Sequence, residues 1–238
     1  SLLPLKDLKD YKLRPMKCEC NFLSKSDGSA ILSQGQTVTL VSVNGPLDIK
    51  MQSQSAEKAT LEVLFCSKGG KPAIGDRYKE HVIRQTCETA ILGSLYPRTG
   101  ITVTIQELED YGGFLACCIN CSCLALLNAG ISMRHTFAAV SCAIDELGNI
   151  QLDAEPTQLA TARATMTFVF DSREKTLVCG KSEFLFLTAE CNCLSSIAFV
   201  AQHSDPYKAS ALIMRGHATL IAIPSIHGTA CSCTFDFV

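Results

Sequence analysis

The sequence predicts an α+β protein built of two similar halves, each with a mixed β-sheet packed against a central helix. Two observations support this fold class. Short stretches of alternating polar and apolar residues are followed by a long helical pattern, and the same order recurs in the second half. The recurrence indicates an internal pseudo-duplication. With 238 residues, 47% of them hydrophobic and 18% charged, the chain is long enough to bury a substantial core.

The first half alternates polar and apolar residues over several short stretches, as half-buried strands do. Strands are therefore predicted at 18–23, 30–32, 37–43, 59–65 and 101–108, the first four forming an antiparallel meander. Between the last two strands, apolar residues at helical spacing over 77–95 predict an amphipathic helix. Tyr96-Pro97 should end this helix, because a residue before proline is pushed out of the helical region.

A second helical segment is apolar on nearly every side. It covers residues 114–129 and is followed by Gly130, a residue suited to the left-handed position after a helix. This predicts a buried central helix, which Asp110 is expected to cap. The uncharged run within it, 115–127, is shorter than the roughly 18 residues of a membrane span. No membrane partner is therefore expected.

The second half returns to strands. They are predicted at 136–144, 150–152, 165–171 and 176–179, followed by a helix at 188–203. From Gly216 onward the pattern does not continue as a helix, and both an extra strand and a partner-binding arm remain open interpretations.

Composition limits the class of function. Lys and Arg total 21 against 23 Asp and Glu, a net charge of −2, which excludes nucleic-acid binding driven by overall charge but leaves room for a local basic patch. Low charge and a high apolar content point to subunit interfaces. No secretory leader is recognised, so the 14 cysteines are interpreted as reduced thiols of a cytosolic or nuclear protein.

Several short motifs carry a resemblance to a known family. They are Asp27-Gly28-Ser29-Ala30 with Gly35-Gln36-Thr37 and Gly45-Pro46, the run 58–63, Tyr96-Pro97-Arg98-Thr99, and the run 115–133, in which Asn120 follows Gly112-Gly113. These runs resemble the RNase PH family, and more closely the RNase PH-type ring subunits of the eukaryotic RNA exosome, in the branch related to the bacterial enzyme.

The resemblance implies an RNase PH-like (ribosomal protein S5 domain 2-like) fold at 17–205, preceded by a lead-in at 1–16 and followed by an atypical tail at 206–238. It also implies a hetero-hexameric ring with other RNase PH-type subunits, together with cap subunits and RNA threaded through a pore. Nucleus, nucleolus and cytoplasm are the implied locations. The implied role is a structural, RNA-contacting subunit that supports 3′-to-5′ RNA processing and degradation.

Family members that catalyse use inorganic phosphate to release the 3′-terminal nucleotide as a diphosphate. In the family, a Thr-Arg pair after the two glycines holds the phosphate, and two acids six residues apart hold a metal or manage a proton. Here the matching positions are Gly112, Gly113, Phe114 and Leu115 for the phosphate, and Leu159 and Thr165 for the acids. The resemblance therefore implies degenerate sites and no catalytic residue. A homodimeric phosphorolytic exoribonuclease or nuclease with a non-standard set, such as Glu155 or Asp153 with Lys79, stays open as the alternative.

Basic residues gather around a glycine-rich loop and the start of the first helix. Lys71, Arg77 and Lys79 are candidates either for contact with RNA phosphates in the pore or for a solvated face, and Arg98 is a weaker candidate for RNA contact. Arg84 is expected on the solvated face, paired with Glu80 and Glu88.

Cysteines 117, 118, 121 and 123 form a conspicuous run in the central helix. Zinc would need four ligands that converge, whereas a helix points Cys123 away from Cys117 and Cys121. Buried apolar thiols are the favoured interpretation, so no metal and no cofactor are expected. The five histidines lie outside any nucleophile motif, which argues against a catalytic triad.

Overall fold

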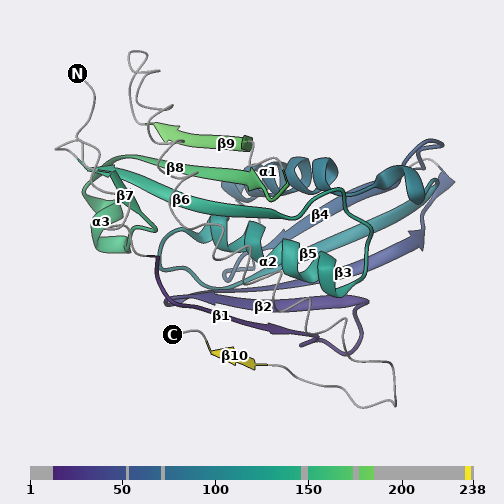
Figure 1. Cartoon of the computed structure of the whole chain (residues 1–238), viewed down its shortest axis with the longest axis horizontal. Helices are drawn as coiled ribbons and strands as arrows, with labels where there is room; N and C mark the ends of the chain where they lie inside the picture. The colour runs from purple at the N-terminus through teal and green to yellow at the C-terminus, as the bar shows by residue number, and fades with distance from the viewer. Residues whose placement is uncertain are drawn as a thin grey trace.

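Two β-sheets enclose a central helix (Figure 1). The computed structural model describes residues 13–51, 54–70, 73–145, 150–173, 177–184 and 234–236. The first sheet has six strands in the order β10-β1-β2-β3-β5-β4, with β1 at Met16–Cys20, β2 at Gly28–Gln34, β3 at Thr37–Asp48, β4 at Thr60–Cys66, β5 at Thr99–Glu109 and β10 at Thr234–Asp236. The second has four strands in the order β7-β6-β8-β9, with β6 at Phe137–Asp145, β7 at Ile150–Leu152, β8 at Ala162–Asp171 and β9 at Leu177–Phe184.

The predicted antiparallel meander holds for β1, β2 and β3 but not for β4. Strand β4 pairs in parallel with β5 along its whole length. The helix α1 (Ile74–Ala90) causes this, because it carries the chain back along the sheet before β5 begins. Including β4 in the meander was therefore wrong.

The second sheet also differs from its prediction. Its described strands are all antiparallel, so it is not a mixed sheet. A short helix that was not predicted, α3 (Pro156–Ala160), precedes β8, with proline in its first turn, where the missing N–H costs nothing. The predicted helix at 188–203 lies outside the described residues.

Helix α1 is shorter at its C-terminal end than predicted. Ile91 is already extended, with ψ at 137°, and forms a β-bridge with Met133. Leu92 N donates to Ser132 O at 3.0 Å, which draws the chain toward the loop after the central helix. The end of α1 is therefore set by this tertiary pairing and not by Tyr96-Pro97.

Helix α2 (Phe114–Asn128) is the predicted central helix, and it lies between the two sheets (Figure 1). The thiols of Cys117 and Cys121 donate to backbone carbonyls of β2. On the opposite side, Asn120 both donates to Ala139 O at 2.9 Å and accepts from Ala139 N at 2.7 Å. One polar side chain thus joins the apolar helix to β6, with both its amide nitrogen and its amide oxygen hydrogen-bonded.

The ends of α2 use glycine. Gly130 after the helix has φ at +69°, as predicted, and Gly113 at its start has φ at +64°. Asp110 does not cap the helix, which was its expected role. Its carboxylate instead accepts a hydrogen bond from Gly112 N at 3.0 Å and so shapes the loop before α2.

The buried cysteines of α2 behave as core residues. Burial raises the pKa of the Cys117 thiol to about 11 and that of Cys123 to about 12. Among the described residues, no three His, Cys, Asp or Glu side chains converge so as to hold a metal ion. None of the described helices combines the length and hydrophobicity of a transmembrane span.

Candidate functional site

A cavity of about 300 Å³ lies where the start of α2 meets the second sheet. Its lining includes Gly113, Phe114 and Leu115, three of the four positions predicted for the degenerate phosphate site, whereas Gly112 is not part of it. It also includes Leu159 from α3 and Thr165 from β8, the residues predicted to stand at the degenerate acid positions. The structure therefore brings the two predicted sets together at one site.

The floor of this cavity is hydrocarbon. Phe114 is 6% exposed, and its ring meets the ring of Phe65 edge to face, with centroids 5.8 Å apart. Leu115 is half-buried beside it. Helix α2 starts without a side-chain cap, so backbone amides alone stand at its positive end.

Lys79 lies at the rim of the same cavity, but its ammonium already has partners. It stands 4.7 Å from the ring centroid of Phe65 and 5.1 Å from that of Phe114, and 3.6 Å from Asp76 Oδ1. Such cation–π contacts are attractive because the ring face is negative. Lys79 thus belongs to this aromatic pair as well as to the predicted basic group.

The other predicted RNA contacts do not form one cluster. Arg77 is exposed near the start of α1, and Lys71 lies outside the described residues. Arg98 precedes β5, whose 11 residues at about 3.3 Å each place it roughly 35 Å along the sheet from the end of β5, which lies near the start of α1 and Arg77. Arg98 therefore cannot act at the same place as Arg77.

Hydroxyl groups on the second sheet complete the lining. Ser141 pairs directly with Thr167 across β6 and β8, and Thr165 lies two residues away on the same face. Ser141 Oγ is buried and has no hydrogen-bond partner in the part of the chain that the structure describes. Sequence reasoning missed Ser141 and Thr167, because only the register between β6 and β8 brings them together.

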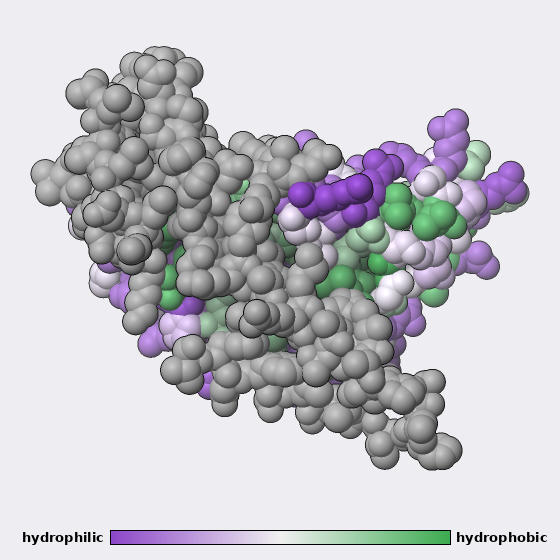
Figure 2. Space-filling view, viewed as in Figure 1, coloured by the Kyte–Doolittle hydropathy of each residue, from purple (hydrophilic) through white to green (hydrophobic). Residues whose placement is uncertain are grey.

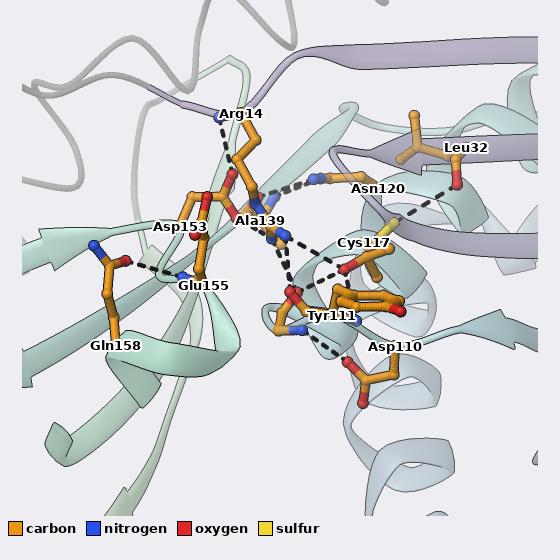
Figure 3. A network of polar contacts seen from close by, with 12 residues as sticks. Arg14, Leu32, Asp110, Tyr111, Cys117, Asn120, Ala139, Asp153, Glu155 and Gln158 are labelled. Atoms are coloured by element: carbon orange, nitrogen blue, oxygen red, sulfur yellow. Dashed lines mark hydrogen bonds and ion pairs between the residues drawn. The ribbon is translucent and has the colours of Figure 1, made fainter. Parts of the chain in front are cut away.

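Asp153 lies next to the cavity but is bound by Arg14 (Figure 3). Arg14 Nη2 is 2.6 Å from Asp153 Oδ1, and Arg14 N donates to Oδ2 at 3.0 Å. The Asp153 side chain is 1% exposed. Burial lowers the pKa of Arg14, but hydrogen bonding and charge from Asp153 outweigh it, and the pKa is raised above its usual value.

The same guanidinium holds the loop before α2. Arg14 donates to Tyr111 O and to Gly112 O, each at 2.9 Å. Arg14 falls in the segment predicted as a lead-in, so its role is a further one that the sequence did not reveal. The domain boundaries themselves stay predictions.

Two glycines let this loop touch the second sheet. A Cβ on Gly112 would lie 2.7 Å from Ala154 O, and one on Gly113 would lie 2.7 Å from Ser141 Oγ. Both distances are shorter than real contacts allow. The Gly-Gly motif is therefore required by the close approach as well as by the positive φ values.

Chemically, the cavity offers hydroxyls, backbone amides, the Cys142 thiol, hydrocarbon and one cation, the Lys79 ammonium, which is held by the rings of Phe65 and Phe114. None of its described lining residues is Asp or Glu. Asp153 is neutralised by Arg14, and Glu155 is exposed, with its backbone N bonded to Gln158 Oε1 at 3.0 Å. The alternative pairing of Asp153 or Glu155 with Lys79 therefore has no geometric support among the described contacts.

Together, the mixed sheet, the buried helix behind a Gly-Gly loop and the second sheet define an RNase PH-type domain. The profile of the 3′ exoribonuclease family, domain 1, matches residues 12–132. The chain belongs to this family.

The curated relatives that match this chain include proteins named as exosome subunits. The exosome complex exonuclease RRP46 homolog of Arabidopsis thaliana is 36% identical over 154 residues, which cover 65% of this chain and 64% of the relative. The match thus spans less than two thirds of that relative's length. The exosome complex exonuclease RRP46 homolog of Oryza sativa subsp. japonica is 30% identical and covers 69% of each chain. Exosome complex component RRP41 of Homo sapiens is 33% identical over 63% of this chain and 69% of its own length.

Solved structures agree on the fold. The crystal structure of rice Rrp46 matches with a TM-score of 0.80 at 25% identity, covering 87% of this chain and 96% of that one. The Archaeoglobus fulgidus exosome with RNA bound to the active site matches with a TM-score of 0.70 at 17% identity, covering 86% and 89%. The second likeness concerns the fold alone.

Proposed function

We propose that this chain is a non-catalytic, RNA-contacting subunit of a hetero-hexameric ring of RNase PH-type chains, as in the RNA exosome. Its role is to complete the channel that leads RNA to 3′-to-5′ processing and degradation elsewhere in the complex. Support comes from relatives named as exosome components and from the fold shared with rice Rrp46. The same proposal predicts nuclear, nucleolar and cytoplasmic locations.

The observation that carries the non-catalytic part is the lining of the cavity. By the resemblance, Phe114 and Leu115 stand where the family holds phosphate and Leu159 and Thr165 where it has acids, and all four line the cavity. Loss of a single acid–base or oxyanion group typically lowers a rate by two to four orders of magnitude. With both kinds of group absent, we expect no turnover above background.

RNA contact rests on exposed cations. Arg77 is exposed and, among the described contacts, has no recorded ion pair, whereas Lys68 nearby is paired with Glu109 at 2.8 Å. Arg77 is therefore the leading candidate, with Lys71 and Arg98 as further predicted contacts and Lys79 restrained by its aromatic partners. Contacts of this kind bind phosphates without reading bases.

One experiment tests catalysis. The pure chain is incubated with labelled RNA, inorganic phosphate and Mg²⁺, and nucleoside diphosphates are measured. We expect none above a no-protein control. Release that scales with phosphate would support the alternative, a homodimeric phosphorolytic exoribonuclease, and would overturn the proposal.

A second experiment tests the structural role. Rings are reconstituted from the RNase PH-type subunits of the same organism with and without this chain, and their mass is measured by light scattering. We expect complete rings only when it is present. Intact rings that lack the chain would refute the role.

A further inference from the structure

A second and larger cavity, of about 620 Å³, lies at the end of the first sheet where β3 finishes and β4 and β5 begin. It has no part in the site described above. Four charged residues from three elements and one loop line it: Asp48, Lys50, Glu62 and Arg84. We call this cavity the β4 groove.

Arg84 reaches the β4 groove from α1, which runs beside the terminal strand β4. One turn earlier on the helix, Glu80 Oε1 accepts a hydrogen bond from Phe65 N at 2.9 Å. Because this amide belongs to the last strand of the sheet, Glu80 and Arg84 lie along the edge of β4. Glu80 is thus engaged with the strand rather than with Arg84, contrary to the predicted pair.

Arg84 also carries a donor without a partner. Its Nε is buried and makes no hydrogen bond within the described residues. A buried donor left unpaired is costly, and native structures pair the great majority of them. Because Nε has almost no exposed surface, a ligand in the β4 groove would pair with the Nη donors of the same guanidinium.

The charges of the groove select the class of ligand. Asp48 and Glu62 are exposed carboxylates on the same lining as Lys50 and Arg84. Because carboxylates repel phosphates, such a lining disfavours an RNA backbone. A polypeptide with an acidic side chain for Arg84 and polar donors for the carboxylates complements it.

Apolar side chains flank the charged lining. Leu47 on β3 is 50% exposed, Met51 beyond the end of β3 is 89% exposed, and Leu64 on β4 is 43% exposed. At this end of the molecule, to the right in Figures 1 and 2, apolar and polar residues lie side by side (Figure 2). Mixed apolar and charged surfaces of this kind are typical of protein interfaces.

We infer that the β4 groove is a subunit interface, which binds an extended segment of a neighbouring RNase PH-type chain through a carboxylate that pairs with Arg84. This inference rests on the proposed ring and names the surface by which this chain meets one neighbour.

The test measures pairwise assembly with each co-expressed RNase PH-type subunit that binds the wild-type chain. Arg84→Glu reverses the charge in the groove, and Arg84→Gln removes it. Arg134→Glu, at an exposed position after α2, is the matched control. We expect Kd to rise at least tenfold for Arg84→Glu and less for Arg84→Gln, with little change for the control. Thermal unfolding of the isolated variants confirms that each still folds.

Carbodiimide coupling provides a second readout, because it joins an amine directly to a carboxylate in contact with it. In the assembled complex we expect Lys50 to be joined to an Asp or Glu of a neighbour, and Arg84→Glu to reduce that product. Reversing the charge of the coupled acid in the partner should restore assembly with Arg84→Glu.

Every other outcome overturns the inference. A ring that forms normally with Arg84→Glu would sink it and leave the proposed function standing. Loss of RNA affinity with assembly unchanged would make the groove an RNA site instead. Failure of the wild-type chain to assemble with any subunit would remove the proposed function and this interface together.

Discussion

The guanidinium of Arg14 and the carboxylate of Asp153 lie 2.6 Å apart although 139 residues separate them in the chain. Arg14 precedes the first sheet, and Asp153 follows β7 of the second. Their contact, with the bonds from Arg14 to the Gly-Gly loop, holds the start of α2 against both sheets. The pair is therefore a structural clamp beside the cavity and not a free acid within it.

Substitution of Asp153 tests this clamp. Asp153→Ala should lower the free energy of unfolding by about 3–5 kcal/mol, because it leaves the Arg14 charge buried without its partner. Asp153→Asn keeps the shape, and Asn tolerates the positive φ of +54° at this position. Its loss should be smaller, about 1.5–3 kcal/mol. Urea unfolding measures both, with exposed Asp48→Ala as the control, and equal values for Asp153→Ala and the control would contradict the clamp.

The close approach of the Gly-Gly loop gives a matched comparison at the two ends of α2. Gly113 and Gly130 have similar φ values of +64° and +69°, but only Gly113 has atoms within 4 Å of an added Cβ. Gly130→Ala should destabilise by about 1–2 kcal/mol through backbone strain alone. Gly113→Ala should lose a further 1–3 kcal/mol, roughly, through the clash with Ser141. Equal losses would show that the contact across the sheets relaxes freely.

Lys79 and Phe114 should be energetically coupled. A double-mutant cycle with Lys79→Gln and Phe114→Leu is expected to give about 0.5–1 kcal/mol of interaction, since Lys79 stays partly exposed to water. Thermal or urea unfolding of the two single variants and the double variant measures it. If the losses of unfolding free energy in the two single variants were strictly additive, Lys79 would not be held by Phe114 and would be available to contact RNA.

The buried thiols predict that the free energy of unfolding depends on pH in alkaline solution. Folding raises the pKa of Cys117 to about 11 and that of Cys123 to about 12, whereas thiols in the unfolded chain have a pKa of about 8.5. Below that pH both states keep their protons and the contribution to stability is complete. As pH rises further, only the unfolded chain loses protons, so the free energy of unfolding falls by up to about 1.4 kcal/mol per unit and per thiol.

Urea unfolding at pH 7.5 and pH 9.5 checks this direction, and alkylation read by peptide mass spectrometry provides the site. Exposed Cys66 should react in the native protein, and Cys117 only after denaturation. Native labelling of Cys117 at neutral pH would contradict the burial described here.

The sequence predicted the positions of helices and strands more accurately than the pairing between strands. The central helix was predicted within one residue at its end, because an apolar run bounded by Gly113 and Gly130 leaves little choice. Alternation identified β4 as a strand but carries no information on direction, so its parallel pairing with β5 was missed. The end of α1 was misplaced because tertiary pairing at Ile91 overrides the local proline signal.

Some residues of the candidate site could be predicted from the sequence, and others could not. The resemblance to the family predicted Phe114, Leu115, Leu159 and Thr165 as site positions, and the structure gathers them along one cavity. Ser141 depends on the register between strands, and Arg14 on a contact between distant segments, so neither has a local signal.

Helix α2 also determines how the molecule comes apart. Both of its flanks are covered, one by β2 and β3 and the other by β6, so removing either sheet would expose apolar surface on the other part. The two sheets are consequently not separable modules. A chain cut after residue 132 would yield two fragments with exposed apolar surface, which would regain the native fold only by reassociating. Thermal unfolding of the intact chain should proceed in a single cooperative step.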